Sequence, residues 1–186
     1  GRHRVIIATQ DPSAVSLYLR SGVGHVATSV ELARRPEPRS VETDLALERL
    51  APGADAVAAI GDLEARLLGH RRDLDIAFLL HHRPAWLARR AGEPVGFAFG
   101  AEGADTGPIA ALDAGDLPAL LDLVESDAAQ RGLDSLSFVV PMTNRVALGH
   151  LLARRFRIDP FYVMVLGDES TMALDRWVHT GPEFIL

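Results

Sequence analysis

Few side chains in this 186-residue chain have types and spacings suited to chemistry. The pKa range of a histidine suits general-base catalysis, and His150 is the candidate; we interpret it as a surface or half-buried helix residue, with the base as the alternative. The rings of His81 and His82 point apart on any regular element, so we predict no shared metal ion. We interpret the acidic residues at 42–44 and 73–75 as solvated turns rather than paired catalytic carboxylates.

The composition excludes several classes of function. The chain has no cysteine, which excludes disulfides, thiolate metal sites and a cysteine nucleophile. All 19 basic residues are arginine, so Schiff-base chemistry and a phosphate-loop lysine are excluded too. The net charge is −6 and the basic residues are scattered, so we expect no nucleic-acid partner. No apolar run approaches the roughly 18 residues of a membrane span and no secretory signal is visible, so we expect no membrane partner and a cytoplasmic location.

Hydrophobic periodicity predicts an α/β protein with a mixed, mostly antiparallel sheet flanked by helices. The first part reads as strand–helix–strand, and Asp11 is the expected cap of its helix. Asp116 is the expected cap of a later helix. Strands are predicted at residues 4–10, 26–32, 45–50, 85–90, 95–100, 107–112, 136–140 and 161–166, and helices at 12–21, 54–72, 74–81, 116–132 and 144–155. We expect the partly apolar tail, residues 174–186, to dock on the body.

The first strand–helix–strand unit resembles the last one. Residues 5–33 align without a gap on residues 138–166, so that strand falls on strand and helix on helix. Asp11 then meets Asn144, and both are residue types that cap helices. This match predicts an internal repeat. We therefore divide the chain into the end of a first domain (residues 1–35), a linker (36–40) and a whole second domain (41–186).

The two repeat helices carry a recognisable pattern, DPSAVSLYLRSGV at residues 11–23 and NRVALGHLLARRF at residues 144–156. This pattern resembles the GNAT N-acetyltransferase superfamily, and the element order of residues 41–186 is similar to the complete GNAT order. The likeness is closest to tandem proteins, in which two such domains share one chain. It implies the acyl-CoA N-acyltransferase fold for the second domain and the last βαβ unit of another for residues 1–35.

The resemblance also implies a cofactor and a site. Members of this superfamily bind acetyl-coenzyme A with backbone amides at a helix N-terminus, which hold the pyrophosphate. A tyrosine of the repeat helix often protonates the departing thiolate, and Tyr18 has that position; a ring packed on the sheet is the alternative. Asn144 is a candidate cofactor contact, with a plain helix cap as the alternative that we favour. The remaining predicted cofactor-binding residues are Ala110, Ala111, Leu112 and Gly115.

The second copy departs from the superfamily pattern at two places. Asp113 and Asp116 would repel a pyrophosphate, and Pro118 has no N–H to donate. Leu151 has the position of Tyr18 in the second copy, and it cannot donate a proton. These departures argue against cofactor binding by the second domain.

Two functions from different classes follow. The first is a GNAT-like transfer of an acetyl group from acetyl-coenzyme A to an amine of a small molecule or protein, with Tyr18 as the acid. The alternative is a catalytically degenerate domain that acts as a structural, dimerisation or ligand-sensing module. A homodimer, in which the βαβ unit of one chain completes another, is a further expectation about partners.

Overall fold

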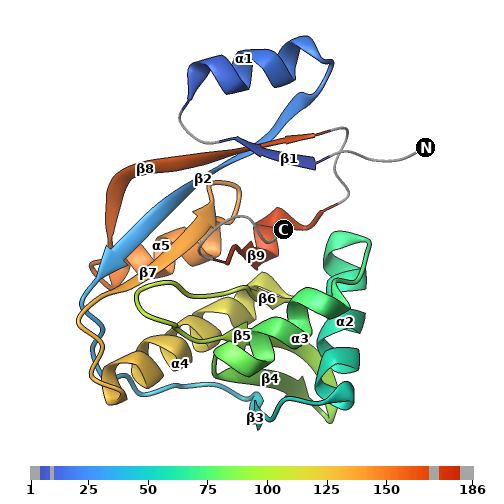
Figure 1. Ribbon diagram of the computed structural model, residues 1–186. Helices are drawn as coiled ribbons and strands as arrows, with labels where there is room; N and C mark the ends of the chain where they lie inside the picture. The colour runs from blue at the N-terminus through green and yellow to red at the C-terminus, as the bar shows by residue number, and fades with distance from the viewer. Residues whose placement is uncertain (1–4, 9–10, 168–171, 181–186) are drawn as a thin grey trace.

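The computed structural model describes residues 5–8, 11–167 and 172–180, which form two antiparallel sheets with helices packed around them. The four-stranded sheet has the order β1-β8-β2-β7, and the five-stranded sheet has the order β3-β4-β5-β6-β9. Figure 1 shows the first sheet in the upper part of the molecule, with α1 above it, and the second sheet in the lower part among α2, α3 and α4. The predicted α/β fold with a mostly antiparallel sheet is confirmed.

The bounds of the elements are as follows. The α-helices are α1 (Pro12–Arg20), α2 (Ala54–Leu68), α3 (Asp73–His82), α4 (Leu117–Gln130) and α5 (Arg145–Ala153), with 3-10 helices at Ala114–Asp116 and Leu174–Arg176. The strands are β1 (Val5–Ala8), β2 (Gly24–Arg34), β3 (Ala46–Leu50), β4 (Ala85–Arg90), β5 (Glu93–Phe99), β6 (Ile109–Ala111), β7 (Leu136–Pro141), β8 (Arg157–Gly167) and β9 (Trp177–Val178).

The two predicted strand–helix–strand units interleave in the four-stranded sheet. Strand β2 lies between β8 and β7 and is antiparallel to both, while β1 pairs with the other edge of β8. Each unit therefore contributes one outer and one inner strand. Residues 5–34 are built into the same sheet as residues 136–167, although more than a hundred residues separate the two units.

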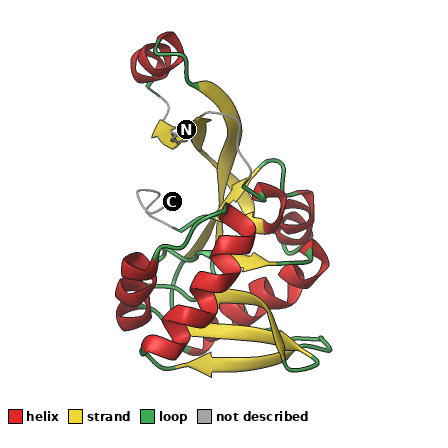
Figure 2. Cartoon of the chain, turned by 90° about the vertical axis from the view of Figure 1, so that its right-hand side faces the viewer, coloured by secondary structure: helices red, strands yellow, loops and turns green. Residues whose placement is uncertain are grey.

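The five-stranded sheet has an apolar core on each face. Leu87, Phe97 and Ala110 pack with the apolar stripes of α2 and α3. Their strand neighbours, such as Trp86 and Ala98, belong to a second core with α4 and α5. Because successive residues of a strand point to opposite faces, the two cores lie on opposite sides of the sheet. Figure 2 shows helices on both sides of the strands in this part of the molecule.

A short extended segment joins the two sheets. Trp177 and Val178 pair with Ala110 and Ile109 of β6. The next residue, His179, forms an antiparallel bridge to Val139 of β7, with a backbone N–H to carbonyl distance of 2.9 Å. The segment therefore lies between β6 and β7, where one sheet ends and the other begins.

Several predicted boundaries need correction or qualification. Helix α2 was expected to reach residue 72 but ends at Leu68, because Gly69 adopts a left-handed conformation with φ of 82°. The tail was expected to dock, and residues 174 and 177–180 of it are buried; residues 181–186 lie outside the described part. Residues 4 and 9–10 of the first predicted strand lie outside it too.

The predicted linker, residues 36–40, has no helix or strand but is tied to α4. The backbone N–H of Glu37 donates to the Glu125 carboxylate, and that of Arg39 lies 3.5 Å from the Ser126 hydroxyl. The segment therefore runs along α4 under hydrogen-bond restraint. The division at this point into two domains stays a prediction.

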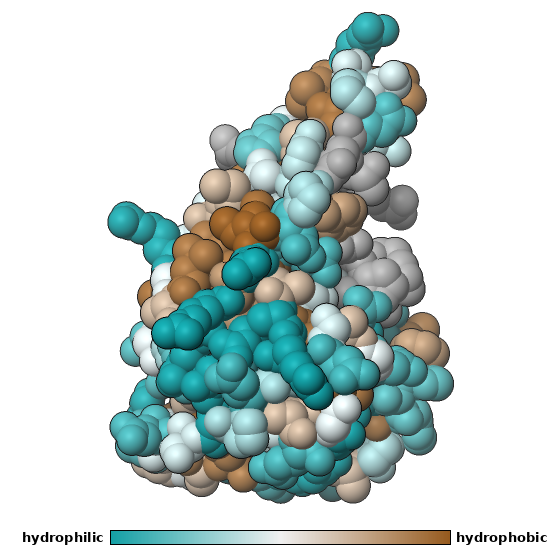
Figure 3. All heavy atoms as spheres, turned by 90° about the vertical axis from the view of Figure 1, so that its left-hand side faces the viewer, coloured by the Kyte–Doolittle hydropathy of each residue, from teal (hydrophilic) through white to brown (hydrophobic). Residues whose placement is uncertain are grey.

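The surface is divided into apolar and hydrophilic areas on one side. Figure 3 shows apolar side chains gathered above a broad hydrophilic area on this face. The exposed large apolar residues of α5 and β8 are Val146, Leu152, Ile158 and Tyr162.

Within the described ranges, no helix combines the length and the apolar character that a membrane span requires.

Candidate functional site

The predicted cofactor strand is fully engaged with its neighbours. Ala110 and Ala111 lie in β6, are buried, and pair with β5 and with the β9 segment. The backbone N–H of Leu112 donates to the carbonyl of Val95 at 2.8 Å, and its carbonyl accepts from the Arg176 guanidinium at 2.9 Å. The backbone polar groups of Leu112 are therefore bonded within the protein.

The amides at the start of α4 are also bonded within the protein. The N–H of Gly115 donates to the Asp113 carboxylate at 2.9 Å, and the N–H of Asp116 donates to the Asp113 carbonyl at 3.1 Å. The N–H of Leu117 donates to the carbonyl of Ala114. Since Pro118 has no N–H, the first turn presents few donors to a ligand. The Asp113 carboxylate accepts the bond that a phosphate oxygen would accept.

Asp116 is the N-cap residue of α4, as predicted, but its side chain makes no capping hydrogen bond and its carboxylate binds Arg90 instead. Its two oxygens lie 2.7 and 3.2 Å from the terminal nitrogens of the guanidinium, and the side chain is 8 % exposed. A two-pronged bond to a charged partner is stronger than one bond to a backbone amide. These hydrogen bonds raise the pKa of Arg90, and Asp44, which accepts from Nε and from one terminal nitrogen of the guanidinium, adds to the effect.

On the repeat helix of the second copy, α5, the two residues at the predicted site are buried within the protein. Asn144 is fully buried; its carbonyl oxygen accepts from the N–H of Ala147 at 3.0 Å, and its amide donates to the carbonyl of Trp177 at 3.0 Å. The favoured interpretation of Asn144 as a helix cap is confirmed. Leu151 is 2 % exposed and packs in the core on the α4 side.

Tyr18 is not brought together with the other predicted site residues. It is half-buried on α1 and packs against a small cluster that contains Val23 and Leu166. Figures 1 and 2 both place α1 at the end of the molecule far from β6 and α4. Its role as an acid stays a prediction, and the described residues around it do not include the predicted cofactor strand.

The residues at the predicted cofactor site do not fit acetyl-coenzyme A. A pyrophosphate needs free amides at the start of α4, but those of Gly115, Asp116 and Leu117 are bonded internally and two carboxylates stand beside them. The space between β6 and β7 is filled by Trp177–His179.

A polar pocket on the other side of α4 was missed by sequence reasoning. It has a volume of about 450 Å³ and is lined by residues of the 36–40 segment, α4 and α5, among them Asp122, His150 and Arg154. Asp122 accepts from His150 and from Arg154, both at 2.8 Å. Burial alone would raise the pKa of Asp122, but the bonds and charges of His150 and Arg154 outweigh it and lower the pKa. His150 is half-buried, as the structural interpretation expected, and its bond to Asp122 joins α5 to α4.

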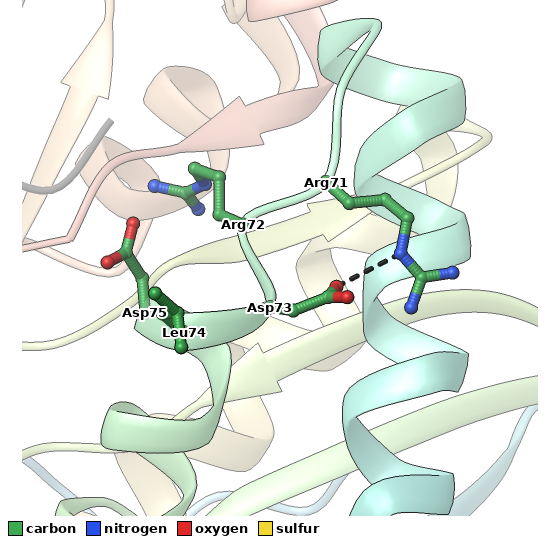
Figure 4. Close-up of a pocket in the computed structure, with 5 residues that line it drawn as sticks. All are labelled: Arg71, Arg72, Asp73, Leu74 and Asp75. Atoms are coloured by element: carbon green, nitrogen blue, oxygen red, sulfur yellow. Dashed lines mark hydrogen bonds and ion pairs between the residues drawn. The ribbon is translucent and has the colours of Figure 1, made fainter.

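A second pocket of about 390 Å³ lies at the first turn of α3 (Figure 4). Arg71 points toward α2, where its guanidinium pairs with Asp62 and with Asp73 at 3.0 Å, while Arg72 points the opposite way. Arg72 is buried and forms a two-pronged ion pair with Glu64, which is 0 % exposed. The acidic residues at 73–75 were interpreted as a solvated turn, and Arg71 and Arg72 were placed at the end of the predicted helix 54–72. Nothing in the spacing of these residues reveals that the two arginines bind carboxylates of α2.

Metal chemistry finds no support in the described ranges. No three histidine or acidic side chains gather there in a way that could hold a metal ion.

Comparison with known proteins gives matches in structure alone. No protein-family model matches the chain, and no curated protein matches its sequence. Solved structures do match, at low sequence identity.

Three of these structures represent the likeness. A protein of Pyrococcus horikoshii assigned as an acetyltransferase has a TM-score of 0.66 and 15% identity over 93% of this chain and 57% of its own. A Drosophila protein has a TM-score of 0.63 and 14% identity over 83% of this chain and 56% of its own. A GCN5-related N-acetyltransferase from Sphaerobacter thermophilus has a TM-score of 0.62 and 17% identity over 90% of this chain and 60% of its own.

This chain thus spans somewhat less than two thirds of the length of these structures. Identities of 14 to 17% show a common fold and nothing finer. The chain has the fold of the GNAT acetyltransferases.

Proposed function

We propose that residues 41–180 form a supporting domain of a GNAT-type N-acetyltransferase and do not themselves use acetyl-coenzyme A. In this proposal, acetyl transfer to an amine belongs to a first domain, whose last βαβ unit is residues 5–34. The observation that carries it is the Trp177–His179 segment, which occupies the space between β6 and β7 and pairs with both.

The segment is an integral part of the fold rather than a loose tail. Trp177 is 1 % exposed and packs edge-on against Phe97, with ring centroids 5.8 Å apart. The side-chain amide of Asn144 donates to the carbonyl of Trp177, and the Arg83 guanidinium donates to the Thr180 hydroxyl at 2.9 Å. A cofactor that entered between these strands would have to displace a buried tryptophan and break these hydrogen bonds.

The interleaved sheet supports the proposed role. Strand β2 of the first unit is held on both sides by β7 and β8. Through it, the second domain fixes the position of α1 and therefore of Tyr18, the proposed acid. Support for the transferase reading of the larger protein comes from the fold that the chain shares with N-acetyltransferases.

The test is thermal unfolding of this chain with and without 1 mM acetyl-coenzyme A. We expect no change in the midpoint, because the amides that would bind pyrophosphate are already bonded. A ligand at about 100 times its Kd would stabilise the fold by roughly 2.7 kcal/mol, which is easily detected. A GNAT-fold enzyme with a free glycine-rich loop, measured in parallel, serves as the positive control.

A clear rise of the midpoint would contradict the supporting role and favour the second candidate function, in which this chain is itself the transferase. The matched variant Asp113→Asn/Asp116→Asn then separates two explanations. If the carboxylates hinder binding, the double variant shows a larger rise than the parent chain; if binding lies elsewhere, the rise is the same in both.

A further inference from the structure

The polar pocket beside α4 is not used by the proposed function. Its volume of about 450 Å³ lies within the range of roughly 300–1,000 Å³ that is usual for small-molecule sites. Its walls come from three parts of the chain, which are residues 38–40 and 42, the first two turns of α4 and the C-terminal end of α5. We call this space the α4–α5 pocket.

Two buried carboxylates of α4 hold arginines at the α4–α5 pocket. Asp122 and Glu125 are 7 % and 2 % exposed, and because they are three residues apart they lie on the same side of the helix. Asp122 accepts from Arg154 at 2.8 Å, and Glu125 accepts from Nε of Arg39 at 3.1 Å. Both arginines line the pocket. Since each guanidinium is bonded to a buried carboxylate, both are held in place before a ligand binds, which lowers the entropy cost of binding.

Both guanidinium groups keep N–H donors for a ligand. A guanidinium has five such donors. Among the described residues, the Arg154 side chain bonds to Asp122 alone, through one terminal nitrogen. Arg39 uses Nε and one terminal nitrogen, on Glu125 and Glu37, so its second terminal nitrogen is left. Guanidinium nitrogens match the geometry of carboxylate oxygens, so the two arginines can receive a carboxylate.

The pocket also has a carboxylate that no described residue neutralises. Glu42 lines the pocket, is exposed, and has no hydrogen bond or ion pair within the described part of the chain. The neighbouring acid Asp44 differs, because it is bound to Arg90 and does not line the pocket. Glu42 can therefore receive an ammonium group, which forms a charge-assisted hydrogen bond with a carboxylate.

The charges at the pocket favour a ligand that carries both signs. A simple anion would bind the two arginines, but it would be repelled by the carboxylates of Asp122 and Glu42. A simple cation would bind Glu42, but it would be repelled by the two guanidinium groups. A zwitterion satisfies both sets of groups and leaves the net charge of the pocket unchanged. Every free α-amino acid carries this combination of an ammonium group and a carboxylate.

We propose that the α4–α5 pocket binds a free amino acid, with its carboxylate on Arg39 and Arg154 and its ammonium group on Glu42. The recognised part is the zwitterion that all amino acids share, so a small amino acid is a sufficient probe. Ser40 also lines the pocket, and its hydroxyl can donate or accept. The proposal does not depend on the supporting role proposed above, and either experiment can fail without affecting the other.

The experiment is an NMR titration of the ¹⁵N-labelled chain with L-alanine at pH 7. The signals to follow are the backbone amides of Ser40, Ala119 and His150, which line the pocket. The amides of Leu74 and Asp75, at the pocket of α3, are the internal control. We expect the first three signals to shift and to saturate with a Kd of about 1 mM, in keeping with the weak binding of so small a molecule. The control signals should stay in place.

L-lactate and L-alaninamide are the matched probes, because each keeps one charge of L-alanine. Lactate keeps the carboxylate and has a hydroxyl in place of the ammonium group. Alaninamide keeps the ammonium group and has a neutral amide in place of the carboxylate. We expect each to bind at least about tenfold more weakly than alanine, because each loses a hydrogen bond between charged groups.

Three variants assign the contacts. Glu42→Gln removes the charge that would bind the ammonium group, so it should weaken alanine about tenfold but should not weaken lactate. Asp44→Asn removes a carboxylate two residues away and is the matched control, which should leave alanine binding unchanged. Arg154→Gln should weaken both alanine and lactate about tenfold, because both carry the carboxylate.

Four results would overturn the proposal. Pocket signals that do not move, or that move without saturation, would mean that the pocket holds water alone. Shifts of equal size at the α3 pocket would mean non-specific contact with alanine. Lactate or alaninamide binding as tightly as alanine would exclude a zwitterion. Equal effects of Glu42→Gln and Asp44→Asn would remove the proposed contact with the ammonium group. Should Arg154→Gln fail to fold, the two probes and Glu42→Gln still decide the outcome.

Discussion

Glu64 of α2 and Arg72, the residue before α3, form an ion pair that is almost completely buried. Glu64 is 0 % exposed and the Arg72 side chain 5 % exposed, and the pair is bonded at two points. Removing one partner of such a pair leaves a buried charge without compensation, which costs about 3–5 kcal/mol. We therefore expect Arg72→Met to lower the free energy of unfolding by that amount, as measured by urea denaturation.

The matched control is the double variant Glu64→Leu/Arg72→Met. With both charges gone, an apolar pair of similar size fills the space between α2 and α3, and the loss should be much smaller than in the single variant. If the two variants were equally destabilised, packing rather than an uncompensated charge would be the cause.

His179 makes the stability of the fold depend on pH. Burial lowers its pKa to about 4, and the positive charge of Arg72 contributes in the same direction. In the unfolded chain its pKa is close to 6.5. Between pH 6.5 and 4 the residue is therefore protonated in the unfolded state but neutral in the folded state. The stability that comes from a neutral His179 is present above pH 6.5 and is lost as the pH falls toward 4.

We expect this residue to account for a loss of about 2–3 kcal/mol between pH 7 and pH 4.5. The measurement is urea unfolding at both pH values for the parent chain and for His179→Gln, whose amide does not titrate in this range. The parent chain should lose more stability than the variant on acidification. Equal losses would show that other groups set the acid sensitivity.

Sequence reasoning was most successful for residues whose role is local. The cap of Asn144 on α5 depends on a backbone amide three residues away, and it was predicted correctly. The position of Asp116 before α4 was predicted correctly too, but its side chain makes no capping bond and binds Arg90, which is 26 residues away in the sequence. The contacts of Arg72 with Trp177 and of Asp122 with His150 join elements far apart in sequence, and no local pattern reveals them.

At the scale of elements, the long periodic segments were predictable and the junctions were not. The helix at 54–72 was correct in type but too long, since a positive φ at Gly69 ends it early. The β9 strand has two residues, too few for a period to be visible. Its position between β6 and β7, on which the proposed function rests, is set by packing of Trp177 rather than by local preference.

Gly107 allows the segment that contains β9 to approach the backbone before β6 closely. It has φ of +80°, and a Cβ at this position would meet the carbonyl oxygen of His179 at 2.3 Å. We expect Gly107→Ala to push the β9 segment away from β6 and to lower the free energy of unfolding by at least about 3 kcal/mol, more than the 1–2 kcal/mol cost of the left-handed conformation alone. Urea denaturation, followed by Trp177 fluorescence in a Trp86→Phe background, measures the loss.

Gly132→Ala is the matched control for that experiment. Gly132 has a similar φ of +74°, but a Cβ there would have nothing within 4 Å. Its substitution should therefore show the conformational cost without the clash, about 1–2 kcal/mol. If the two variants lost the same stability, the close approach of β9 to Gly107 would not limit the fold.

At the scale of the molecule, the two units of the predicted repeat share one sheet rather than forming separate sheets. The sequence indicated two similar units and suggested a boundary between them. The structure places β2 of the first unit between β7 and β8 of the second, so the units share one sheet. Matching periods along a chain predict the presence of two strand–helix–strand units, but the order in which their strands pair is decided by long-range packing.

This arrangement predicts that two truncations differ sharply. Removing residues 1–21 deletes β1 and α1, a helix with no fully buried residue, and leaves β2 in place. Removing residues 1–35 also deletes β2, whose Ala27 and Leu32 belong to the two large cores. We expect the shorter deletion to retain a cooperative thermal transition within about 10 °C of the parent chain, in line with a loss of 1–2 kcal/mol. The longer one should lose the transition, because β7 and β8 are left with unpaired inner edges. A cooperative transition after the longer deletion would show instead that residues 41–186 fold alone, which would make the 36–40 segment a true domain boundary and the pairing of β2 a contact between independent domains.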